Sequence, residues 1–283
     1  MTFAVVEARP ARPEAPGIDA AVAAEWLVAF LRDELIVRRG ISRAVLGLSG
    51  GVDSAVTAFL CARALGPENV YAIRMPYKSS HPSSLSDAQL VVDALKIPAQ
   101  TIEISAAVDG YLQFEPDADA RRRGNVMARI RMVVLFDQSA KLDALPVGTG
   151  NKTERLLGYF TWHADDTPPV NPLGDLFKSQ VWALARYLGV PARLIEKAPT
   201  ADLQADQTDE GDLGISYARA DAILAAILQG YSDGQLIELG FSANEVGLVR
   251  RRLDATHWKR HLPTTAMLTN TAINEFYLRP VDY

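Results

Sequence analysis

The chain has 283 residues, of which 48% are hydrophobic and 22% charged, a balance typical of a globular protein with one large or two small domains. Its 29 basic and 34 acidic residues give a formal net charge of -5, which argues against a general surface for nucleic acid. Apolar runs fall short of the roughly 20 residues that a membrane-spanning helix needs, and the lone cysteine, Cys61, excludes an internal disulfide. We therefore expect no nucleic-acid or membrane partner and a reducing, cytoplasmic location.

The first predicted element is a helix over residues 18–40. Its apolar residues recur with a helical period after Asp19, a good N-cap residue, and Gly40 ends the pattern. Residues 1–17 are rich in proline and lack the basic start and long apolar stretch of a signal peptide, so we expect a flexible N-terminal tail. Residues 18–283 are expected to form a single domain.

Further along the chain, apolar stretches typical of strands alternate with helical patterns. The predicted strands cover residues 43–48, 69–76, 100–104 and 144–150, and the helices between them include 84–96 and 122–141. This alternation predicts a Rossmann-like, doubly wound α/β fold, with about five parallel strands flanked by helices and additional helices toward the C-terminus. In such sheets ligands bind beyond the carboxyl ends of the strands. The long polar loops 162–172 and 198–214 are candidate binding loops.

The stretch GLSGGVDSAV, residues 47–56, follows the first predicted strand and allows two interpretations. Its first five letters fit the G-x-S-x-G of a hydrolase, with Ser49 as the nucleophile. That motif needs an oxyanion loop from an earlier strand, and no upstream segment supplies such a strand here. We therefore favour the second interpretation, in which the loop wraps a phosphate.

The phosphate interpretation explains more of the loop. Gly50 and Gly51 allow a tight turn, the hydroxyls of Ser49 and Ser54 are donors, and the helix that opens near Asp53 points unpaired N–H groups at an anion. The lysine of a Walker A loop is absent, and Asp53 stands there instead. A carboxylate beside phosphates makes sense when Mg²⁺ lies between them, although Asp53 taken alone is equally well explained as a helix cap.

The string SGGVDS is the signature of the PP-loop ATP pyrophosphatases, which cleave ATP between the α- and β-phosphates and leave an adenylylated intermediate. Within that superfamily, four further stretches resemble NAD synthetase in order and spacing: GNVMARIRM (124–132), GTGNKTERLLGYFT (148–161), NPLGDLFKSQVWALARYLGVP (171–191) and KAPTADLQADQTDEGDLGISY (197–217). The resemblance covers roughly residues 18–262. Because several independent strings support it, the chain is identified as similar to the ammonia-dependent NAD synthetases.

This resemblance implies a two-step amidation. ATP adenylylates the nicotinate carboxylate of deamido-NAD and releases pyrophosphate, and ammonia then displaces AMP to give NAD. Mg²⁺ is the implied cofactor, ATP the implied co-substrate and a homodimer the implied assembly. Free ammonia is the expected nitrogen donor, because the tail and the first helix leave no room for the glutaminase domain of longer relatives. A separate glutaminase partner stays open.

Matching the family motifs residue by residue implies three groups of site residues. ATP contacts are expected from Gly47, Ser49, Gly50, Gly51, Val52, Asp53, Ser54, Arg74, Thr149, Lys178 and Thr200. Asp53 and Glu154 are the expected Mg²⁺ ligands and, with Lys178, the expected catalytic residues. Contacts with deamido-NAD are expected from Arg129, Trp162, His257, Trp258 and Lys259. Taken singly, Lys178 and Arg129 are also explained as solvated residues of amphipathic helices, and Glu154 as a first-turn acid.

The departures from the family pattern fall on the deamido-NAD side. In TWHADDTPPVNP (161–172), Trp162 and Pro169 stand where relatives have a lysine and an aspartate among the substrate contacts. Trp258 and Lys259 stand where a His–Lys pair is expected, with His257 one place earlier. Two other classes therefore stay open. One is another PP-loop adenylating enzyme, similar to GMP synthetase or to tRNA-modifying enzymes, and the other is a nucleotide-binding module without catalysis.

Overall fold

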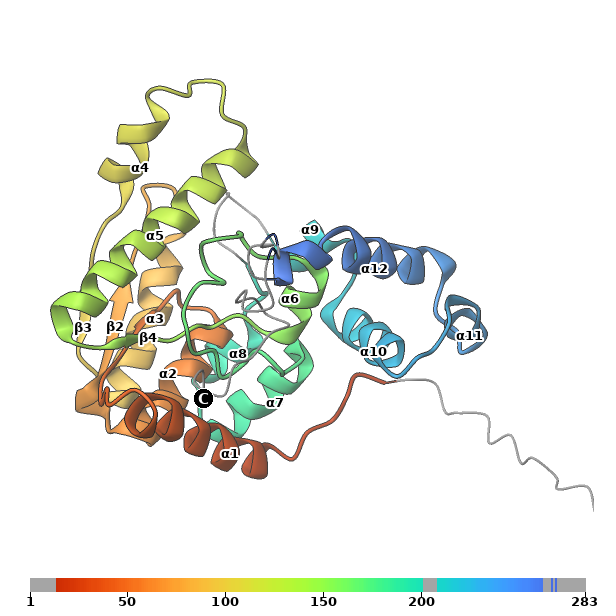
Figure 1. Cartoon of the computed structure of the whole chain (residues 1–283), viewed down its shortest axis with the longest axis horizontal. Coiled ribbons are helices and arrows are strands. Elements are labelled where there is room, and N and C mark those ends of the chain that lie inside the picture. The colour runs from red at the N-terminus through yellow and green to blue at the C-terminus, as the bar shows by residue number, and fades with distance from the viewer. Residues whose placement is uncertain (1–13, 201–207, 262–265, 267, 269–283) are drawn as a thin grey trace, which may run out of the picture.

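The computed structural model describes residues 14–200, 208–261, 266 and 268. Most of the expected tail over residues 1–17, and part of the predicted loop 198–214, lie outside these residues, so neither prediction is tested. Within the described residues, helices surround a central sheet and a second group of helices lies to one side of it (Figure 1).

The centre of the fold is a parallel sheet with the strand order β3-β2-β1-β4. The strands are β1 (Ala44–Gly47), β2 (Val70–Arg74), β3 (Ala99–Thr101) and β4 (Leu145–Pro146), and each overlaps a predicted stretch. In this register Ala44 lies opposite Val70 on one side and Leu145 on the other. Parallel neighbours need crossover connections, which the helices between the strands provide.

The prediction of about five strands is wrong for the described residues, which form a four-stranded sheet. Beyond β4, the chain makes one isolated parallel bridge, between Val147 and Val170. Pro168 and Pro169 precede Val170, and Pro172 follows it closely. Because proline has no N–H to donate to a ladder, this segment pairs at one residue and does not continue as a strand.

One face of the sheet is covered by α1 (Ala20–Arg32), α2 (Val52–Leu65), α3 (Pro82–Leu95) and α7 (Lys178–Leu188). Ala44, Leu46 and Ala72 point to this face and are fully buried. Most residues of α2 are buried, because this helix packs against three helices and the sheet at once. Its position fixes the loop that precedes it.

The first predicted helix is present as α1, followed by a π-helical turn over Asp33–Val37. Asp19 accepts the N–H groups of Ala21 and Val22 at 3.0 and 3.1 Å, which confirms it as the N-cap. The chain leaves the helical region through Gly40, whose φ of +66° is left-handed.

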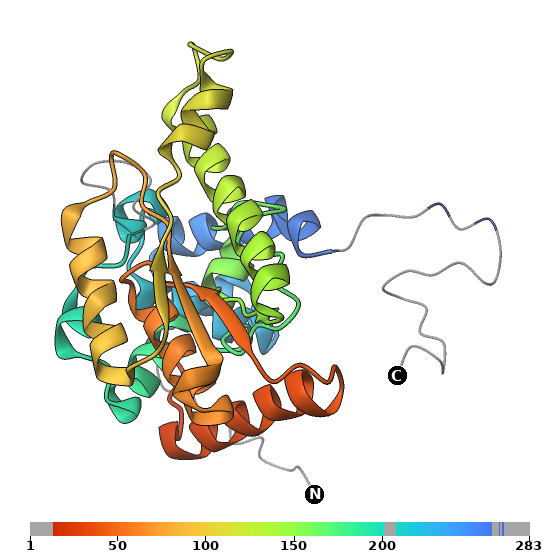
Figure 2. The same ribbon diagram turned by 90° about the vertical axis from the view of Figure 1, so that its left-hand side faces the viewer.

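The other face of the sheet is covered by α5 (Ala120–Leu142), and α4 (Ser105–Leu112) packs against α5. Val45 and Ile73 point to this side, where they pack against Leu135 of α5. Neighbouring strand residues point to opposite faces, so both sides of the sheet are apolar. Figure 2 shows α3 and α5 on opposite sides of the strands. Helices on both faces confirm the doubly wound α/β prediction.

The predicted additional helices follow the sheet and form a second apolar core. The remaining elements are η2 (Pro67–Asn69), α6 (Lys152–Leu157), α8 (Ala192–Glu196), α9 (Asp209–Leu213), α10 (Tyr217–Leu228), α11 (Asp233–Glu238), α12 (Ala243–Ala255) and η3 (His257–Arg260). Trp182 of α7 contacts both apolar cores and so joins this group to the sheet. Across the described ranges, we find no helix with the length and apolar character needed to cross a membrane.

Candidate functional site

A cavity of about 910 Å³ opens at the carboxyl ends of β1, β2 and β4. Its walls come from the loops that follow these strands, from α5 and from the first turns of α2, α6 and α7. This is the edge at which doubly wound sheets bind ligands. All the predicted site residues line the cavity except Gly50 and His257.

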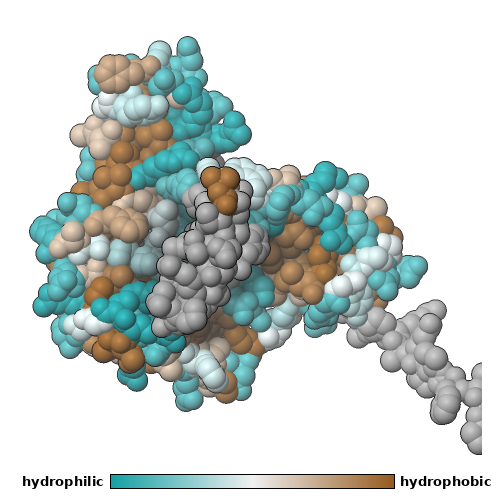
Figure 3. All heavy atoms as spheres, in the orientation of Figure 1, coloured by the Kyte–Doolittle hydropathy of each residue, from teal (hydrophilic) through white to brown (hydrophobic). Residues whose placement is uncertain are grey.

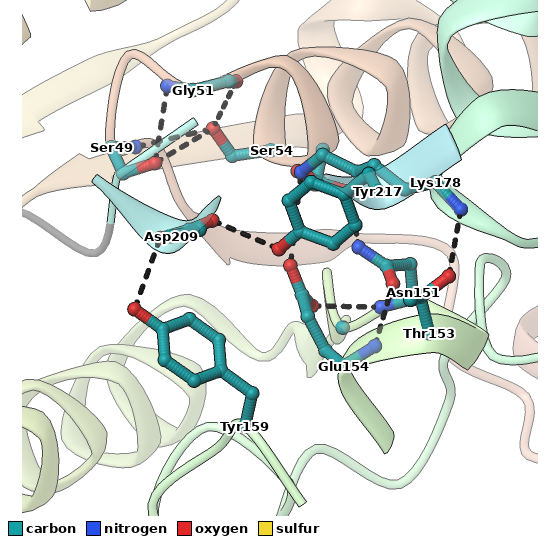
Figure 4. Close-up of polar contacts among 12 residues, drawn as sticks. Ser49, Gly51, Ser54, Asn151, Thr153, Glu154, Tyr159, Lys178, Asp209 and Tyr217 are labelled. Atoms are coloured by element: carbon teal, nitrogen blue, oxygen red, sulfur yellow. Dashed lines mark hydrogen bonds and ion pairs between the residues drawn. The ribbon is translucent and has the colours of Figure 1, made fainter. Parts of the chain in front are cut away.

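The loop between β1 and α2 forms one wall of the cavity. Gly51 is the N-cap residue of α2, and within the described ranges no side chain caps this helix, so its first N–H groups are available to an anion. The hydroxyl oxygens of Ser49 and Ser54 lie 3.1 Å apart, and that of Ser49 accepts the Gly51 N–H at 3.2 Å (Figure 4). Hydroxyl and backbone donors thus gather where the phosphate interpretation expects them.

Gly50 shapes this loop from outside the cavity. Its φ is +81°, and a Cβ at this position would lie 2.4 Å from the carbonyl oxygen of Ser84 in α3. Only glycine fits a backbone that is both left-handed and this close to a neighbouring helix. Gly50 holds the loop against α3 and does not line the cavity, and its expected contact with ATP stays a prediction.

Asp53, Glu154 and Lys178 come from three helices and meet in the cavity wall. Lys178, the first residue of α7, has 2% of its side chain exposed, and its ammonium forms an ion pair with Asp53 of α2. The same Nζ lies 3.7 Å from Oε1 of Glu154 in α6. The alternative that Lys178 is a solvated helix residue is therefore wrong.

Three carboxyl groups, those of Asp53, Glu154 and Asp209, act on the one buried ammonium of Lys178. Burial and the charge of Asp53 raise the pKa of Glu154 to about 8. Burial by itself lowers the pKa of Lys178, but the carboxylates of Asp53 and Glu154 outweigh it and raise that pKa above its ordinary value. Burial also raises the pKa of Asp209, which accepts the hydroxyls of Tyr217 and Tyr159 at 3.0 and 3.2 Å (Figure 4). Three carboxylates around one ammonium favour a further cation.

A Mg²⁺ ion fits this set of donors. Magnesium prefers oxygen ligands and is usually held by one or two carboxylates together with substrate phosphates. Asp53 and Glu154 are two such carboxylates, and a divalent cation would offset the excess negative charge around Lys178. No group of three or more acidic, His or Cys side chains forms a metal cage within the part of the chain that the structure describes. The site therefore suits a metal that arrives with a nucleotide.

Three buried residues that were not predicted hold this cluster in place. Asn151 donates its amide to Oδ1 of Asp53 at 3.0 Å. Asp221 of α10 accepts the hydroxyl of Thr153 at 2.5 Å and the N–H of Ser179 at 2.8 Å, and so joins the N-termini of α6 and α7. The pattern N-x-x-E resembles a capping box and could have identified Asn151. Thr153 and Asp221 give no local signal.

The remaining predicted ATP contacts also lie in the cavity wall. Arg74 is the last residue of β2, Thr149 follows β4 and Thr200 follows α8. Nη1 of Arg74 donates to Oε1 of Gln89 at 2.5 Å, which fixes the direction of the guanidinium. The structure thus brings the ATP-side residues of distant stretches to one cavity.

The chain as a whole, and not the cavity alone, points to one family. The sequence model of the family described as NAD synthase matches residues 23–263, a range that includes every cavity residue named above. The chain belongs to the NAD synthase family. The NH(3)-dependent NAD(+) synthetase of Fusobacterium nucleatum is 48% identical over 243 residues, which are 86% of this chain and 94% of that protein. The enzyme of the same name from Trichlorobacter lovleyi is 46% identical over 258 residues, with 91% and 94% covered.

Solved structures of similar proteins share the fold of this chain. The NH3-dependent NAD synthetase from Campylobacter jejuni has a TM-score of 0.76 and 32% identity, covering 88% of this chain and 100% of that one. An NMN synthetase from Francisella tularensis has a TM-score of 0.79 and 31% identity, covering 88% and 99%. The similarity therefore spans those chains from end to end.

The residues expected to contact deamido-NAD include the rings of Trp162 and Trp258 in the cavity wall. The ring of Trp162 lies 3.9 Å from that of His163 and 5.1 Å from that of Trp258, between centroids. Arg129 of α5 donates to the carbonyl oxygen of Trp162 at 3.0 Å and holds this loop against the helix. Aromatic rings favour a planar partner, which they can meet face to edge or in an offset stack.

Two of these expected contacts have other partners. His257 lies outside the cavity wall, and its Nδ1 is 2.8 Å from the carbonyl oxygen of Asp254. Successive side chains of a 3₁₀ turn diverge, and here Trp258 lines the cavity while His257 does not; the expected contact of His257 with deamido-NAD stays a prediction. Lys259 does line the cavity, but its ammonium donates to the carbonyls of Gly158 and Phe160 at 2.7 and 2.5 Å.

Proposed function

We propose that this chain catalyses the ATP-dependent amidation of deamido-NAD by ammonia, with NAD, AMP and pyrophosphate as products. One observation carries the proposal: the loop 47–54, Asp53, Glu154 and Lys178 converge on one cavity in a chain whose relatives are named NH(3)-dependent NAD(+) synthetases. A nucleotide-binding module without catalysis has no need of a buried ammonium between two carboxylates. The family match argues against the other PP-loop enzymes.

The first step activates a poor electrophile. An oxygen of the nicotinate carboxylate attacks the α-phosphorus of ATP, the bond to the β-phosphate oxygen breaks, and pyrophosphate leaves. The hydroxyls of Ser49 and Ser54 and the first N–H groups of α2 hold the departing pyrophosphate. The buried ammonium of Lys178 adds a fixed positive charge beside it. Asp53 and Glu154 would hold Mg²⁺, which would supply positive charge to offset the negative charge on the leaving group.

The second step transfers nitrogen. Ammonia adds to the carbonyl carbon of the adenylate, loses a proton, and expels AMP together with one of the two carboxylate oxygens. The amide of NAD keeps the other oxygen. The chain's own residues act here by holding the adenylate in place, with AMP beside the loop that bound ATP.

We propose that the aromatic cluster of Trp162 and Trp258 binds the dinucleotide. Trp162 and Trp258 offer ring faces in the cavity wall, and Arg129 lies at its border with a guanidinium that attracts phosphate. Trp162→Ala should raise the KM for deamido-NAD severalfold and leave the KM for ATP unchanged. An equal change in both KM values would show that Trp162 has no specific part in binding deamido-NAD.

A second candidate substrate is the mononucleotide. The NMN synthetase structure is similar in fold, and by the family resemblance Trp162 and Pro169 stand where polar substrate contacts are expected. The same two steps on nicotinate mononucleotide yield NMN. Comparing kcat/KM for the two substrates in one assay decides which the enzyme prefers.

We also propose a cytoplasmic homodimer. Val133 and Phe136 of α5 are 64% and 42% exposed, and Phe114, which follows α4, is 74% exposed. Figure 3 shows apolar surface over α4 and α5 on the viewed face. Exposed apolar side chains on the longest described helix favour a self-complementary interface. Light scattering should give twice the mass of the chain, and the mass of one chain would contradict the dimer.

The assay that tests the function mixes the purified protein with ATP, Mg²⁺ and deamido-NAD, and supplies ammonium chloride or glutamine. We expect NAD and AMP in equal amounts with ammonium. Absence of NAD with both donors would contradict the proposal. Asp53→Ala should abolish pyrophosphate release while the folded circular-dichroism spectrum is kept, and an unchanged rate would remove Asp53 from the metal site.

A further inference from the structure

Asn151 is fully buried and touches both carboxylates that we assign to Mg²⁺. Its Oδ1 accepts the N–H of Glu154 at 2.9 Å, and its own N–H donates to Oε2 of Glu154 at 3.1 Å (Figure 4). Its Nδ2 donates to Oδ1 of Asp53 at 3.0 Å. Asn151 thus contacts two carboxylates that lie far apart in the sequence: its side-chain amide donates to Asp53 of α2, and its backbone N–H donates to Glu154 of α6.

The chemistry of its partners fixes which way the Asn151 amide faces. The Glu154 N–H only donates, so the atom that meets it is the amide oxygen. The Asp53 carboxylate only accepts, so the atom that meets it is the amide nitrogen. Serine and aspartate also cap helices well through an oxygen, but neither presents an N–H to Asp53. Capping α6 therefore does not account for the whole role of Asn151.

The contacts of Asn151 also decide which carboxylate oxygens remain for a ligand. Asp53 is held on both sides, by Asn151 at Oδ1 and by Lys178 at Oδ2. Glu154 is bound through Oε2, which leaves Oε1 directed toward Lys178. Loss of the Asn151 donor would free the Asp53 carboxylate to rotate away from this arrangement.

We propose that Asn151 is a positioning residue that sets the spacing and orientation of Asp53 and Glu154 for the Mg²⁺ that accompanies ATP. This inference rests on the proposed function, because it takes these two carboxylates as the metal ligands. Asn151 itself acts through them. Substitution of Asn151 should lower the affinity for the metal more than it lowers the stability of the fold.

Two variants separate positioning from capping. Asn151→Ser keeps an oxygen that caps α6 but loses the amide donor to Asp53. Asn151→Asp keeps the cap and the side-chain size but puts a third carboxylate beside Asp53 and Glu154. Asn69→Ser is the matched control, because the Asn69 amide donates to the carbonyl of Leu65 at 2.8 Å, at the opposite end of α2 from Asp53.

The readout is Mn²⁺ binding, followed by electron paramagnetic resonance with and without the non-hydrolysable analogue α,β-methylene ATP. Thermal melting of each variant reports on the fold. The Mg²⁺ concentration for half-maximal NAD formation gives a second measure.

With the analogue, we expect Asn151→Ser to bind Mn²⁺ roughly tenfold more weakly than wild type, the usual loss when a partner of a metal ligand is removed. Asn69→Ser should bind like wild type. Without nucleotide, Asn151→Asp should bind Mn²⁺ severalfold more tightly, because it adds a carboxylate. If Asn151→Ser does not fold, Asn151→Asp carries the test.

Wild-type Mn²⁺ affinity in the folded Asn151 variants would overturn the inference and leave the proposed function intact. Other results would contradict the proposed function itself. In that case the wild-type protein itself would not bind Mn²⁺ with the analogue, or Asp53→Ala would bind it as tightly as wild type, and the role of Asn151 would fall with the metal site.

Discussion

At the scale of single residues, Gly50 controls the shape of the phosphate loop. Its left-handed φ, and the mere 2.4 Å that would separate a Cβ from the Ser84 carbonyl oxygen, leave no space for a side chain. Gly50→Ala should push the loop away from α3, weaken ATP binding at least tenfold and cost about 1–3 kcal/mol of unfolding free energy. Calorimetric ATP titration and urea denaturation measure both effects.

Gly234→Ala is the control for this substitution, because nothing lies within 4 Å of the position a Cβ would take there. It should bind ATP like wild type. If Gly50→Ala also kept the wild-type affinity, the close approach of the loop to α3 would have no part in nucleotide binding.

The residues of the site differed in how far the sequence could predict them. Ser49, Asp53 and Ser54 lie in one short motif between a predicted strand and a predicted helix. Their position at the carboxyl end of that strand could therefore be predicted from the sequence. The burial of Lys178 was not predictable, because it depends on packing between α7 and α2. The position of His257 outside the cavity wall was not predictable either, because no local pattern tells which residue of a 3₁₀ turn faces a cavity.

At the scale of secondary-structure elements, Asp221 fixes α6 against α7. Its buried carboxylate accepts from Thr153 and Ser179 at the N-termini of these helices, where an anion is stabilised. Asp221→Ala leaves both donors unpaired and should cost about 2–4 kcal/mol of unfolding free energy. It should also lower kcat for pyrophosphate release, because Glu154 and Lys178 sit on the helices that it joins.

Urea denaturation and a pyrophosphate assay check this prediction. Glu238→Ala, an exposed substitution in α11, is the control and should change neither quantity. Wild-type stability of Asp221→Ala would show that the two helices hold their positions without this carboxylate.

The ion pair between α10 and α12 predicts a pH dependence of stability. Arg219 donates to both carboxylate oxygens of Glu245 at 2.8 Å, and these bonds lower the pKa of Glu245 to about 2 from its ordinary 4.5. A carboxyl group whose pKa is lowered by folding stabilises the protein above its unfolded pKa. That stability is lost as the pH falls from about 4.5 toward 2.

Solvent screening reduces the effect of this pair, whose side chains are 29% and 26% exposed. Glu245→Gln should therefore lower the free energy of unfolding by about 1–2 kcal/mol at pH 7, and by less at pH 3. Urea denaturation at both pH values measures the difference. An equal loss at the two pH values would show that the charge of Glu245 is not what stabilises the contact.

At the scale of the whole molecule, the alternation of strand and helix patterns was enough to predict the α/β class and the edge of the sheet that holds the site. The number of strands was not predictable from apolar patterns, because Pro168 and Pro169 stop the pairing of an otherwise suitable segment. The meeting of α2, α6 and α7 at one cavity depends on packing between distant segments. Asp221, which joins two of these helices, lies in an ordinary helical pattern and gave no sign of that role.

The central claim, that the nicotinate carboxylate is adenylylated before it is amidated, is tested most directly by following one oxygen atom. Deamido-NAD labelled with ¹⁸O in both carboxylate oxygens is converted with ATP, Mg²⁺ and ammonium, and the AMP is analysed by mass spectrometry. We predict one ¹⁸O in each AMP, because the oxygen that attacks the α-phosphorus leaves with AMP while the other stays in the amide of NAD. AMP without label would contradict this account, since it would mean that the carboxylate never joined the α-phosphate.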